Sequence, residues 1–246
     1  MDFSNDKVLI TGGTRGIGRQ LARDFAEHGA RVVVCGRDRE RLTSVAAHPN
    51  IDATPCDVRD DASVQALAAT VADTLGTPTV VINNAAIFQQ IALLDSPVES
   101  WLREVDINLM GVLRVTHALL PGLLDADRAT IVNLTSPAGY VPMTAAPVYS
   151  ATKAAINSWS QSLHHQLRHT NVSVIMVNPP VVDTQMNADN PNVEGMKRWS
   201  TEAFSEAVLS QFSRSRTRDI HIGDAWLVSR IARFVPSMIF SRMNPS

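Results

Sequence analysis

The sequence has few cysteines and little excess charge. Only two cysteines occur among the 246 residues, Cys35 and Cys56, and both follow apolar runs typical of strands. Two cysteines in such positions do not indicate a fold held together by disulfides. We therefore expect both to be buried free thiols. The formal net charge is −2. The chain therefore lacks the basic excess that would favour a nucleic-acid partner. It also lacks the acidic tail that would favour a disordered partner.

Long apolar segments are also lacking. No apolar run is long enough to span a bilayer, and the N-terminal MDFSNDKVLITGG has no charged region followed by an apolar one, as a secretion signal would. We therefore expect a cytoplasmic protein without a membrane span. What is present is a globular composition, with 45% hydrophobic and 19% charged residues in a length that suits one α/β domain.

Short apolar runs alternate with longer helical patterns along most of the chain. The runs predict strands at 8–11, 31–36, 52–57, 79–85, 129–136 and 172–179. The patterns between them predict helices at 16–29, 37–47, 60–75, 98–125 and 148–169. Continuously apolar strands are typical of a parallel sheet covered on both faces. The sequence therefore predicts a Rossmann-type doubly wound parallel sheet with helices on both faces, in a single domain over residues 1–246.

The pattern changes after residue 184. A polar, irregular stretch is followed by the helical run AFSEAVLSQFSR, so about 185–215 is predicted to form a substrate loop with a helical insert. The run DIHIG at 219–223 fits an edge strand, and it opens a C-terminal segment, 219–246, rich in large apolar residues. We expect that segment to pack on its own domain or on a partner subunit. A membrane-surface helix is less favoured, because its polar face is not strongly basic.

A glycine-rich turn, TGGTRGIG at 11–18, joins the first strand to the first helix. Glycines let the backbone turn tightly and approach a phosphate, and the following helix N-terminus favours an anion. The position of this turn in a βαβ unit therefore predicts a nucleotide site at Gly12, Gly16 and Gly18. Their spacing differs from GxGxxG, which indicates a different subtype of dinucleotide site.

The second strand bears on which dinucleotide would bind. NAD sites usually place an acidic residue at its end, to hold the ribose 2′-hydroxyl, but here the strand ends in Cys35-Gly36-Arg37. Arg37, together with Arg15 in the glycine-rich turn, can instead present a guanidinium to a 2′-phosphate. The sequence therefore favours NADP, while Asp38 directly after Arg37 leaves NAD open.

A tyrosine and a lysine lie four residues apart in the helical stretch VYSATKAAINSW at 148–159. That spacing brings Tyr149 and Lys153 onto one face. Ser136 ends the fifth predicted strand, at the edge where ligands bind in such sheets, and Asn108 lies in the long helix after the fourth strand. Each of these residues alone has an ordinary structural explanation, such as a cap or a solvated charge. Together they suggest a catalytic site.

Together with TGGTRGIG and NNAA at 83–86, these residues resemble the short-chain dehydrogenase/reductase family over residues 7 to about 184. The resemblance implies an oxidoreductase, most often one that reduces a carbonyl reversibly with NADPH. Tyr149 would donate the proton, and the Lys153 ammonium would lower its pKa from the usual value of about 10. Ser136 would polarise the carbonyl oxygen. Lys153 would also bind the nicotinamide ribose, and Asn108 would help hold a water relay to Lys153.

The resemblance also implies the cofactor contacts. Asp57 and Val58 would contact the adenine, Asn84 and Ala85 the adenosine ribose, and Val182 and Thr184 the carboxamide. The whole set of implied cofactor-binding residues is Gly12, Thr14, Arg15, Gly16, Ile17, Gly18, Arg37, Asp57, Val58, Asn84, Ala85, Tyr149, Lys153, Val182 and Thr184. No metal site is predicted. The chain departs from the family at Ala86 and Pro180, where a glycine is usual.

Within the family, residues 141–187 are most similar to DltE-type oxidoreductases, which share the double proline. The segment 185–205 and a short run after Ser136 are candidate substrate walls; the latter comprises Ala138, Tyr140, Val141, Pro142 and Met143. Their apolar character favours a lipophilic or medium-sized carbonyl or alcohol, and leaves polyketide-like, lipid-like and amino-acid-derived substrates open.

Two other functions remain open at this point. One is a non-catalytic NADP-binding sensor or scaffold, although such proteins commonly lose the tyrosine or the lysine. The other is epimerisation or imine reduction with the same four residues. The resemblance further implies a homodimer or homotetramer that pairs through the helices at 98–125 and 148–169. In the second helix, Ala151, Ala154, Ala155, Ile156 and Trp159 offer a small, apolar surface for such packing.

Overall fold

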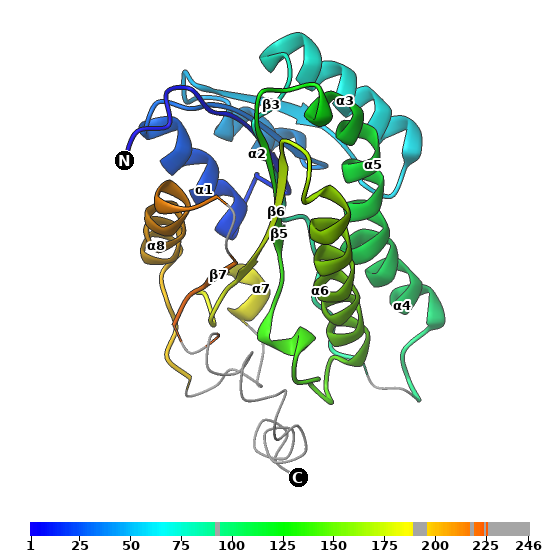
Figure 1. Cartoon of the computed structure of the whole chain (residues 1–246). Coiled ribbons are helices and arrows are strands. Elements are labelled where there is room, and N and C mark those ends of the chain that lie inside the picture. The colour runs from blue at the N-terminus through cyan, green and yellow to red at the C-terminus, as the bar shows by residue number, and fades with distance from the viewer. Residues whose placement is uncertain (92–93, 189–195, 217–218, 224, 226–246) are drawn as a thin grey trace.

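A parallel β-sheet forms the centre of the molecule (Figure 1). The computed structural model describes all residues except 92–93, 189–195, 217–218, 224 and 226–246. Among the described residues, seven strands pair in the order β3-β2-β1-β4-β5-β6-β7, all parallel. Their bounds are β1 Lys7–Thr11, β2 Arg31–Gly36, β3 Ile51–Pro55, β4 Val80–Asn83, β5 Ala129–Leu134, β6 Val172–Asn178 and β7 Ile220–His221. The chain order reverses between β1 and β4, which is where such sheets open a ligand crevice.

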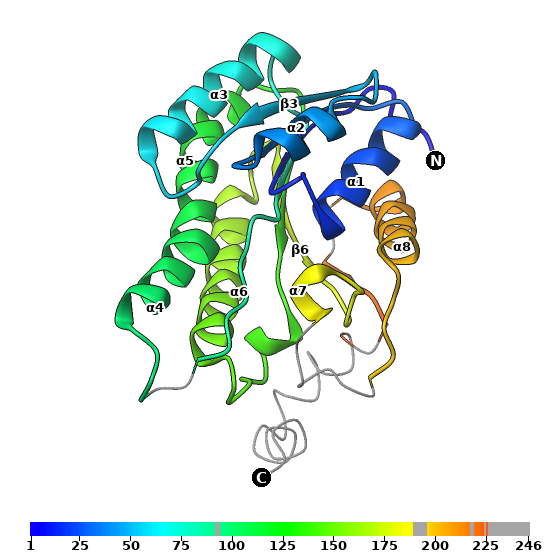
Figure 2. The same ribbon diagram turned by 180° about the vertical axis from the view of Figure 1, so that it is seen from behind.

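Helices cover both faces of this sheet. Their bounds are α1 Gly16–Glu27, α2 Arg39–Val45, α3 Asp61–Leu75, α4 Val98–Val105, α5 Gly111–Leu124, α6 Pro147–Leu167, α7 Gln185–Ala188 and α8 Thr201–Arg214. A π-helical turn, η1 Asp106–Met110, joins α4 to α5, and a 3₁₀ turn, η2 Pro137–Gly139, follows β5. Figures 1 and 2 show α1 and α8 on one face and α3, α5 and α6 on the other.

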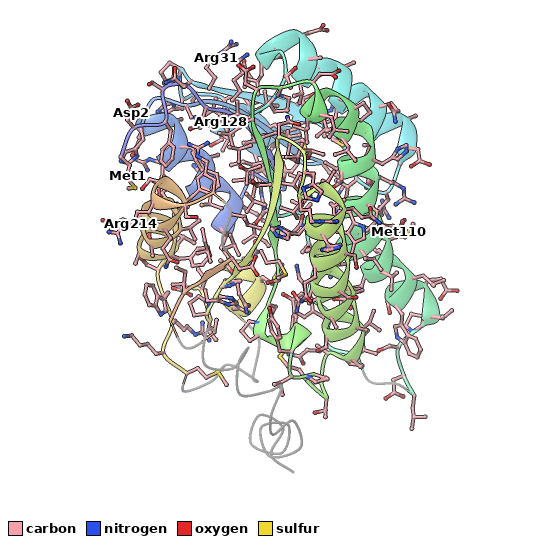
Figure 3. All side chains as sticks on the ribbon, in the orientation of Figure 1. Met1, Asp2, Arg31, Met110, Arg128 and Arg214 are labelled. Carbon is pink, nitrogen blue, oxygen red and sulfur yellow. The ribbon has the colours of Figure 1, made fainter. Side chains whose placement is uncertain are left out.

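The core follows from the alternation of side chains along each strand. In β1, Val8 and Ile10 pack with α1 and α8 through residues such as Phe25 and Phe204. Leu9 points to the opposite face and packs with α3, α5 and α6. Side chains fill the space on both faces of the sheet, while Arg31 and Arg214 lie at the periphery (Figure 3). Because both faces are buried, the strands need the continuously apolar runs that predicted them.

The predicted fold class is confirmed, and each predicted element appears near its expected place. The helix predicted over 98–125 is present, but η1 divides it into α4 and α5. The helical run after residue 202 is α8, and the predicted edge strand is β7. Cys35 and Cys56 are buried free thiols, as expected. The apolar stretch at 226–246 lies outside the described residues.

The helix Val98–Leu124 differs from the expectation that no segment could span a membrane. It is long enough and apolar enough to do so by length and composition. Its buried residues, among them Val115, Leu119 and Leu123, pack into the core beside the sheet. The core helix of a soluble protein meets the same two criteria, so length and composition alone do not assign this helix to a membrane.

Candidate active site

A cavity of about 430 Å³ opens at the carboxyl ends of β1, β2, β4 and β5. Most of the predicted cofactor-binding residues line it, namely Gly12, Thr14, Arg15, Gly16, Ile17, Arg37, Asp57, Val58, Asn84, Ala85, Tyr149, Lys153 and Thr184. Gly18, Asn108, Ser136 and Val182 do not line it. The topology therefore brings segments that are far apart in the sequence to one opening. This opening lies where the strand order reverses, which is where such sheets bind ligands.

The glycine-rich turn is held close to the loop that follows β4. Gly12 has a φ of +64°, and a Cβ there would lie 2.9 Å from the Cα of Ala85. A Cβ on Gly18 would lie 2.4 Å from Nδ2 of Asn84. That amide nitrogen donates hydrogen bonds to the backbone oxygens of Thr11 and Gly12, at 2.9 and 3.0 Å. Larger side chains at these two glycines would therefore separate the turn from Asn84.

The first helix begins at the cavity, which its residues Gly16 and Ile17 line. Arg15 is the N-cap residue of α1, its side chain makes no capping hydrogen bond, and the first turn has no acidic residue. The first N–H groups of a helix lack partners within the helix and attract anions. Together with the glycine cradle, this arrangement fits the diphosphate of a dinucleotide.

Three arginines, Arg15, Arg37 and Arg41, line the cavity near the end of β2. Asp38, the acidic residue that kept NAD as an alternative cofactor, contacts Arg41 of α2. Its carboxylate accepts the backbone N–H of Arg41 at 3.1 Å, and this hydrogen bond caps α2. The same carboxylate forms an ion pair with the Arg41 Nε at 3.0 Å. The sequence reading missed Arg41, although an N-cap aspartate followed three residues later by arginine is a recognisable pattern. Arg15 donates to Oε1 of Gln185 in α7, at 3.3 Å.

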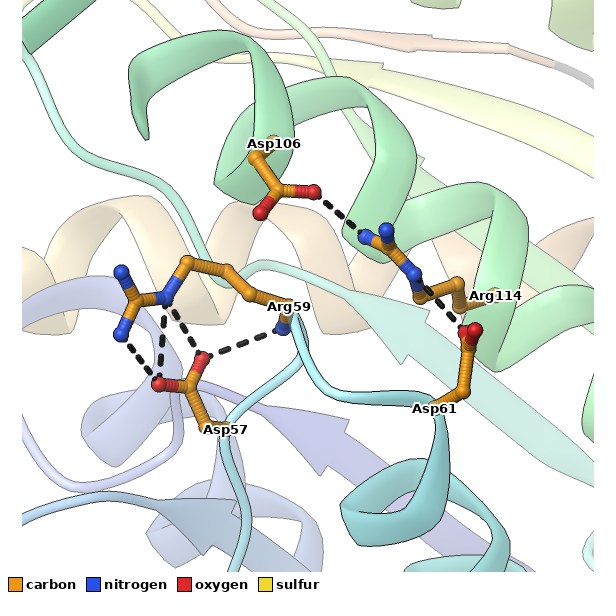
Figure 4. A network of polar contacts seen from close by, with 5 residues as sticks. All are labelled: Asp57, Arg59, Asp61, Asp106 and Arg114. Carbon is orange, nitrogen blue, oxygen red and sulfur yellow. Dashed lines mark hydrogen bonds and ion pairs between the residues drawn. The ribbon is translucent and has the colours of Figure 1, made fainter. Parts of the chain in front are cut away.

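Asp57 has a partner that the sequence reading did not include (Figure 4). Both of its carboxylate oxygens accept hydrogen bonds from the Arg59 guanidinium, at 2.6 Å for Nη2 to Oδ2 and 3.0 Å for Nε to Oδ1. These bonds hold the pKa of Asp57 below its usual range. Arg114 similarly bridges Asp61 and Asp106, at 2.9 and 2.6 Å. Of these five residues, Asp57 lines the cavity, and its charge is paired with Arg59.

Tyr149 and Lys153 line the cavity, and Ser136 lies beside Tyr149 without lining it. Tyr149 lies in the first turn of α6 and is 9% exposed. Burial raises the pKa of Tyr149 to about 12, although the Ser136 hydroxyl lowers that pKa by hydrogen-bonding to the phenol. β5 ends at Leu134, so Ser136 lies two residues beyond the strand rather than at its end, and its Oγ accepts the N–H of Ala138 at 3.2 Å. The side chains that the sequence pattern singled out are therefore neighbours.

Lys153 lies one helical turn beyond Tyr149 and is buried, at 5% exposed. Its Nζ donates to the backbone oxygen of Leu134, the last residue of β5, at 2.9 Å. Burial lowers the pKa of Lys153 to about 8, and the nearby Glu104 carboxylate opposes that shift. Lys153 is thus a buried amine that changes charge near neutral pH.

Asn108 lies in η1 and fastens the loop after β4. Its Oδ1 accepts the N–H of Ile87 at 2.8 Å, and its Nδ2 donates to the Ile87 oxygen at 2.9 Å. The same Nδ2 reaches Thr152 Oγ1 at 3.4 Å, one residue before Lys153 in α6. Its side chain therefore connects the loop to the helix that carries Tyr149.

Glu104, one turn before Asn108, is a residue that the sequence reading missed. It is fully buried, at 0% exposed, and accepts the N–H of Gln89 at 3.1 Å. Burial raises the pKa of Glu104 to about 7. The signal available in the sequence was the four-residue spacing of Glu104 and Asn108, the same spacing that singled out Tyr149 and Lys153.

Beyond Tyr149 lies an apolar cluster that includes Ala138 and Met143. Phe88 was not predicted; its ring packs edge-on against Tyr149, with centroids 5.1 Å apart. Val141, predicted as a substrate wall, is only 2% exposed and is packed inside. None of the predicted wall residues after Ser136 lines the described cavity, whereas Gln185 of the predicted substrate loop does.

The two departures from the family pattern, Ala86 and Pro180, differ in their relation to the cavity. Ala86 lines the cavity, and its φ is not positive, so the alanine imposes no backbone strain. Pro179 lines the cavity but Pro180 does not. The Val182 oxygen accepts from Nδ2 of Asn187 at 2.9 Å, and Thr184 lines the cavity beside Gly16.

Comparisons with known proteins identify the family of the chain. The profile of the short chain dehydrogenase family matches residues 6–194. The uncharacterized oxidoreductase DltE of Bacillus subtilis (strain 168) is 37% identical over 199 residues, which cover 80% of this chain and 79% of that protein.

Two solved structures are similar over nearly the whole chain. A variant of actinorhodin polyketide ketoreductase with NADPH has a TM-score of 0.81 and 27% identity, covering 94% of this chain and 100% of that one. The closed form of serine dehydrogenase complexed with NADP⁺ has a TM-score of 0.80 and 27% identity, covering 88% and 94%. With its sheet, glycine-rich turn and matched profile, the chain belongs to the short-chain dehydrogenase/reductase family of oxidoreductases and is similar to DltE.

Proposed function

We propose that the protein is an NADPH-dependent carbonyl reductase, which reduces a ketone or related carbonyl to an alcohol and can run in reverse. One observation carries this proposal. Tyr149, hydrogen-bonded by Ser136 and one turn from Lys153, lies at the inner end of the cavity that the glycine-rich turn borders. This arrangement offers a proton donor beside a dinucleotide-shaped opening.

The choice of NADPH over NADH rests on charge. Arg15, Arg37 and Arg41 line the adenosine end, and β2 ends without an acidic residue. Asp38 is paired with Arg41 and caps α2, so its carboxylate is not poised for a ribose hydroxyl. A guanidinium binds a phosphate well because it offers several donors in one plane. Both of the 27% identical structural relatives were solved with NADPH or NADP⁺, which supports the same choice.

The residues of this chain then divide the work of the reaction. Bound NADPH would supply the hydride. Tyr149 stays protonated at neutral pH because burial raises its pKa to about 12, and it gives that proton to the carbonyl oxygen. Ser136 donates a hydrogen bond to the same oxygen and stabilises its developing negative charge. The Lys153 ammonium stabilises the phenolate that Tyr149 becomes and would hold the nicotinamide ribose.

The apolar cluster beside Tyr149 indicates the kind of substrate. Phe88 packs against the tyrosine ring and Met143 packs against the same cluster, so the group next to the reacting carbonyl would be apolar. The experiment is a panel of apolar ketones and the corresponding alcohols, followed by NADPH absorbance and repeated with NADH. We expect NADPH-dependent turnover of at least one ketone. Tight NADPH binding without turnover across the panel would contradict carbonyl reduction and favour a sensor.

We also propose that the protein is a homodimer or homotetramer that pairs through α5 and α6. Ala151 and Ala154 are exposed on α6, which allows a second helix to approach closely. Ile156 belongs instead to the interior of its own subunit, because it is only 1% exposed. Light scattering of the purified protein tests the oligomeric state, and an Ala154→Arg variant should weaken an assembly that uses this face.

A further inference from the structure

Glu104 is a fully buried carboxyl group with few contacts to stabilise its charge. Its Oε1 accepts the backbone N–H of Gln89 at 3.1 Å. Its Oε2 is buried and has no hydrogen-bond partner in the described part of the chain. Burying an unpaired carboxylate costs free energy. A neutral amide side chain could accept the same loop hydrogen bond at a lower desolvation cost. The carboxyl therefore calls for a role in which its charge matters.

The position of Glu104 relates it directly to the candidate catalytic residues. Glu104 and Asn108 fasten neighbouring parts of one loop, at Gln89 and Ile87. The helix α4 packs against α6, which carries Tyr149 and Lys153, and both ribbon views show the two helices side by side. Asn108 also reaches Thr152 of α6, so the stretch that carries Glu104 is connected to the helix that carries Tyr149 and Lys153.

The charged and titratable groups around Glu104 are few. Tyr149 and Lys153 lie on α6, which packs against α4, and the Glu104 charge raises the pKa of both groups. The loop contributes the backbone N–H of Gln89, which carries no charge. On the outer side of the same helical stretch, Arg103 is exposed and Asp106 is paired with Arg114. Among the described residues, Lys153 is the cation whose charge favours ionisation of Glu104.

We propose that Glu104 is a positioning residue that sets the charge state of the Tyr149–Lys153 pair. Its carboxylate holds Lys153 as the ammonium and opposes formation of the phenolate at Tyr149. When Glu104 takes up a proton, both effects disappear. The proposal rests on the proposed function only in assigning Tyr149 as the proton donor.

The direction of the effect follows from the three groups. Burial raises the pKa of Glu104 to about 7, so this carboxyl changes charge near neutral pH. Above that pH the carboxylate raises the pKa of Lys153 and also raises the pKa of Tyr149. Below it, the neutral carboxyl leaves the phenolate easier to form. Removing the charge permanently should therefore lower the pKa of Tyr149.

The test is an ultraviolet titration of the tyrosinate in protein saturated with NADP⁺. The chain has two tyrosines, so a Tyr140→Phe background leaves Tyr149 as the one reporter. In that background Glu104→Gln keeps the acceptor for the Gln89 N–H and the size of the side chain, and removes the charge. We expect the pKa of Tyr149 to fall by about one unit, the effect of a unit charge several ångströms away in a partly buried site.

Glu99→Gln is the matched control, because Glu99 is exposed in the first turn of the same helix and its charge is screened. It should leave the titration unchanged. If Glu104→Gln titrates like the background, or no differently from Glu99→Gln, the proposal is overturned. A residue that only holds the loop would give that result, since the amide makes the same hydrogen bond. The titration needs no substrate, so its outcome is independent of whether carbonyl reduction is the reaction.

A second measurement needs no substitution and does not depend on the variant folding. Nuclear magnetic resonance of the protein with isotope-labelled glutamate carboxyl groups should find one carboxyl that titrates near neutral pH. A spectrum in which every glutamate carboxyl titrates near its ordinary value of about 4.3 would overturn the proposal.

Discussion

The side-chain nitrogen of Lys153 lies 5.6 Å from the centroid of the Tyr149 ring, and it is fixed there by a hydrogen bond to the Leu134 oxygen at 2.9 Å. The lysine thus holds its charge next to the phenol from a position that the end of β5 defines. Because Leu134 precedes Ser136 by two residues, one strand end positions both groups that act on Tyr149.

The burial of Lys153 predicts that NADPH binding depends on pH. Its pKa is lowered to about 8, so the ammonium predominates below that pH and the neutral amine above it. We expect the Kd for NADPH to rise as pH increases through about 8, because the amine holds the ribose hydroxyls and the phosphate charge less well. Fluorescence titrations across this pH range measure it. Lys153→Met should bind NADPH about tenfold more weakly, near 1.4 kcal/mol, with no inflection near that pH. An inflection that persists in the variant would assign it to another group.

Replacing Arg37 should change the cofactor preference. Arg37→Asp removes a guanidinium from the adenosine end and places a carboxylate where a ribose 2′-hydroxyl could donate to it. We expect the ratio of kcat/KM for NADPH to that for NADH to fall at least about tenfold, or about 1.4 kcal/mol. Arg39→Asp makes the same charge change at an exposed residue of α2 that does not line the cavity. Equal effects of the two substitutions would contradict a specific 2′-phosphate contact.

The close approach of Gly18 to Asn84 predicts intolerance of a side chain. In Gly18→Ala the new Cβ would lie 2.4 Å from Nδ2 of Asn84 and 2.6 Å from the Gly12 oxygen. We expect loss of NADPH binding in calorimetry and a lower Tm. Gly122→Ala is the control, since no atom lies within 4 Å of its new Cβ in α5. That change should leave binding intact and stabilise the helix by up to about 1 kcal/mol. Normal cofactor binding by Gly18→Ala would refute the packing of this turn.

An ion pair far from the cavity should contribute to stability. The Asp6 carboxylate, 2% exposed, accepts two hydrogen bonds of 2.6 Å from Arg216, whose guanidinium also stacks 4.8 Å from the Phe212 ring. Asp6→Asn leaves the guanidinium without its anion, and we expect a loss of about 3 kcal/mol in denaturant unfolding. The exposed pair of Glu27 with Arg23 gives the comparison: Glu27→Gln should cost less than about 1 kcal/mol. Similar losses in the two variants would show that burial adds nothing to the first pair.

Much of the fold could be predicted because the sheet is buried on both faces. Strands such as RVVVCG at 31–36 then need continuously apolar sequences, and β2 begins and ends where that run does. The π turn at Asp106–Met110 could not be predicted, because one extra residue in a turn leaves the apolar pattern of the long helix nearly unchanged. Helix packing, which local sequence does not encode, decides where such a turn forms.

Some residues of the candidate site could be predicted from local sequence, and others could not. Tyr149 and Lys153 share a helix face, and Ser136 follows the end of a strand by two residues, so local geometry was enough to bring them together. The burial of Glu104 depends on how α4 packs against α6, and the contact of Phe88 with Tyr149 depends on the path of a loop. The four-residue spacing of Glu104 and Asn108 is visible within one segment, but the burial of Glu104 and the contact of Phe88 are not. Tertiary packing therefore supplied the residues that the sequence reading missed.

The central claim is that Tyr149 donates the proton in an NADPH-dependent reduction. The most direct test compares Tyr149→Phe with the unsubstituted protein, measuring kcat for the best ketone and the Kd for NADPH. Phenylalanine keeps the ring that packs against Phe88 and removes only the hydroxyl. We predict that kcat falls at least about a hundredfold while the Kd for NADPH changes less than about threefold. Turnover by Tyr149→Phe at the rate of the unsubstituted protein would contradict the claim.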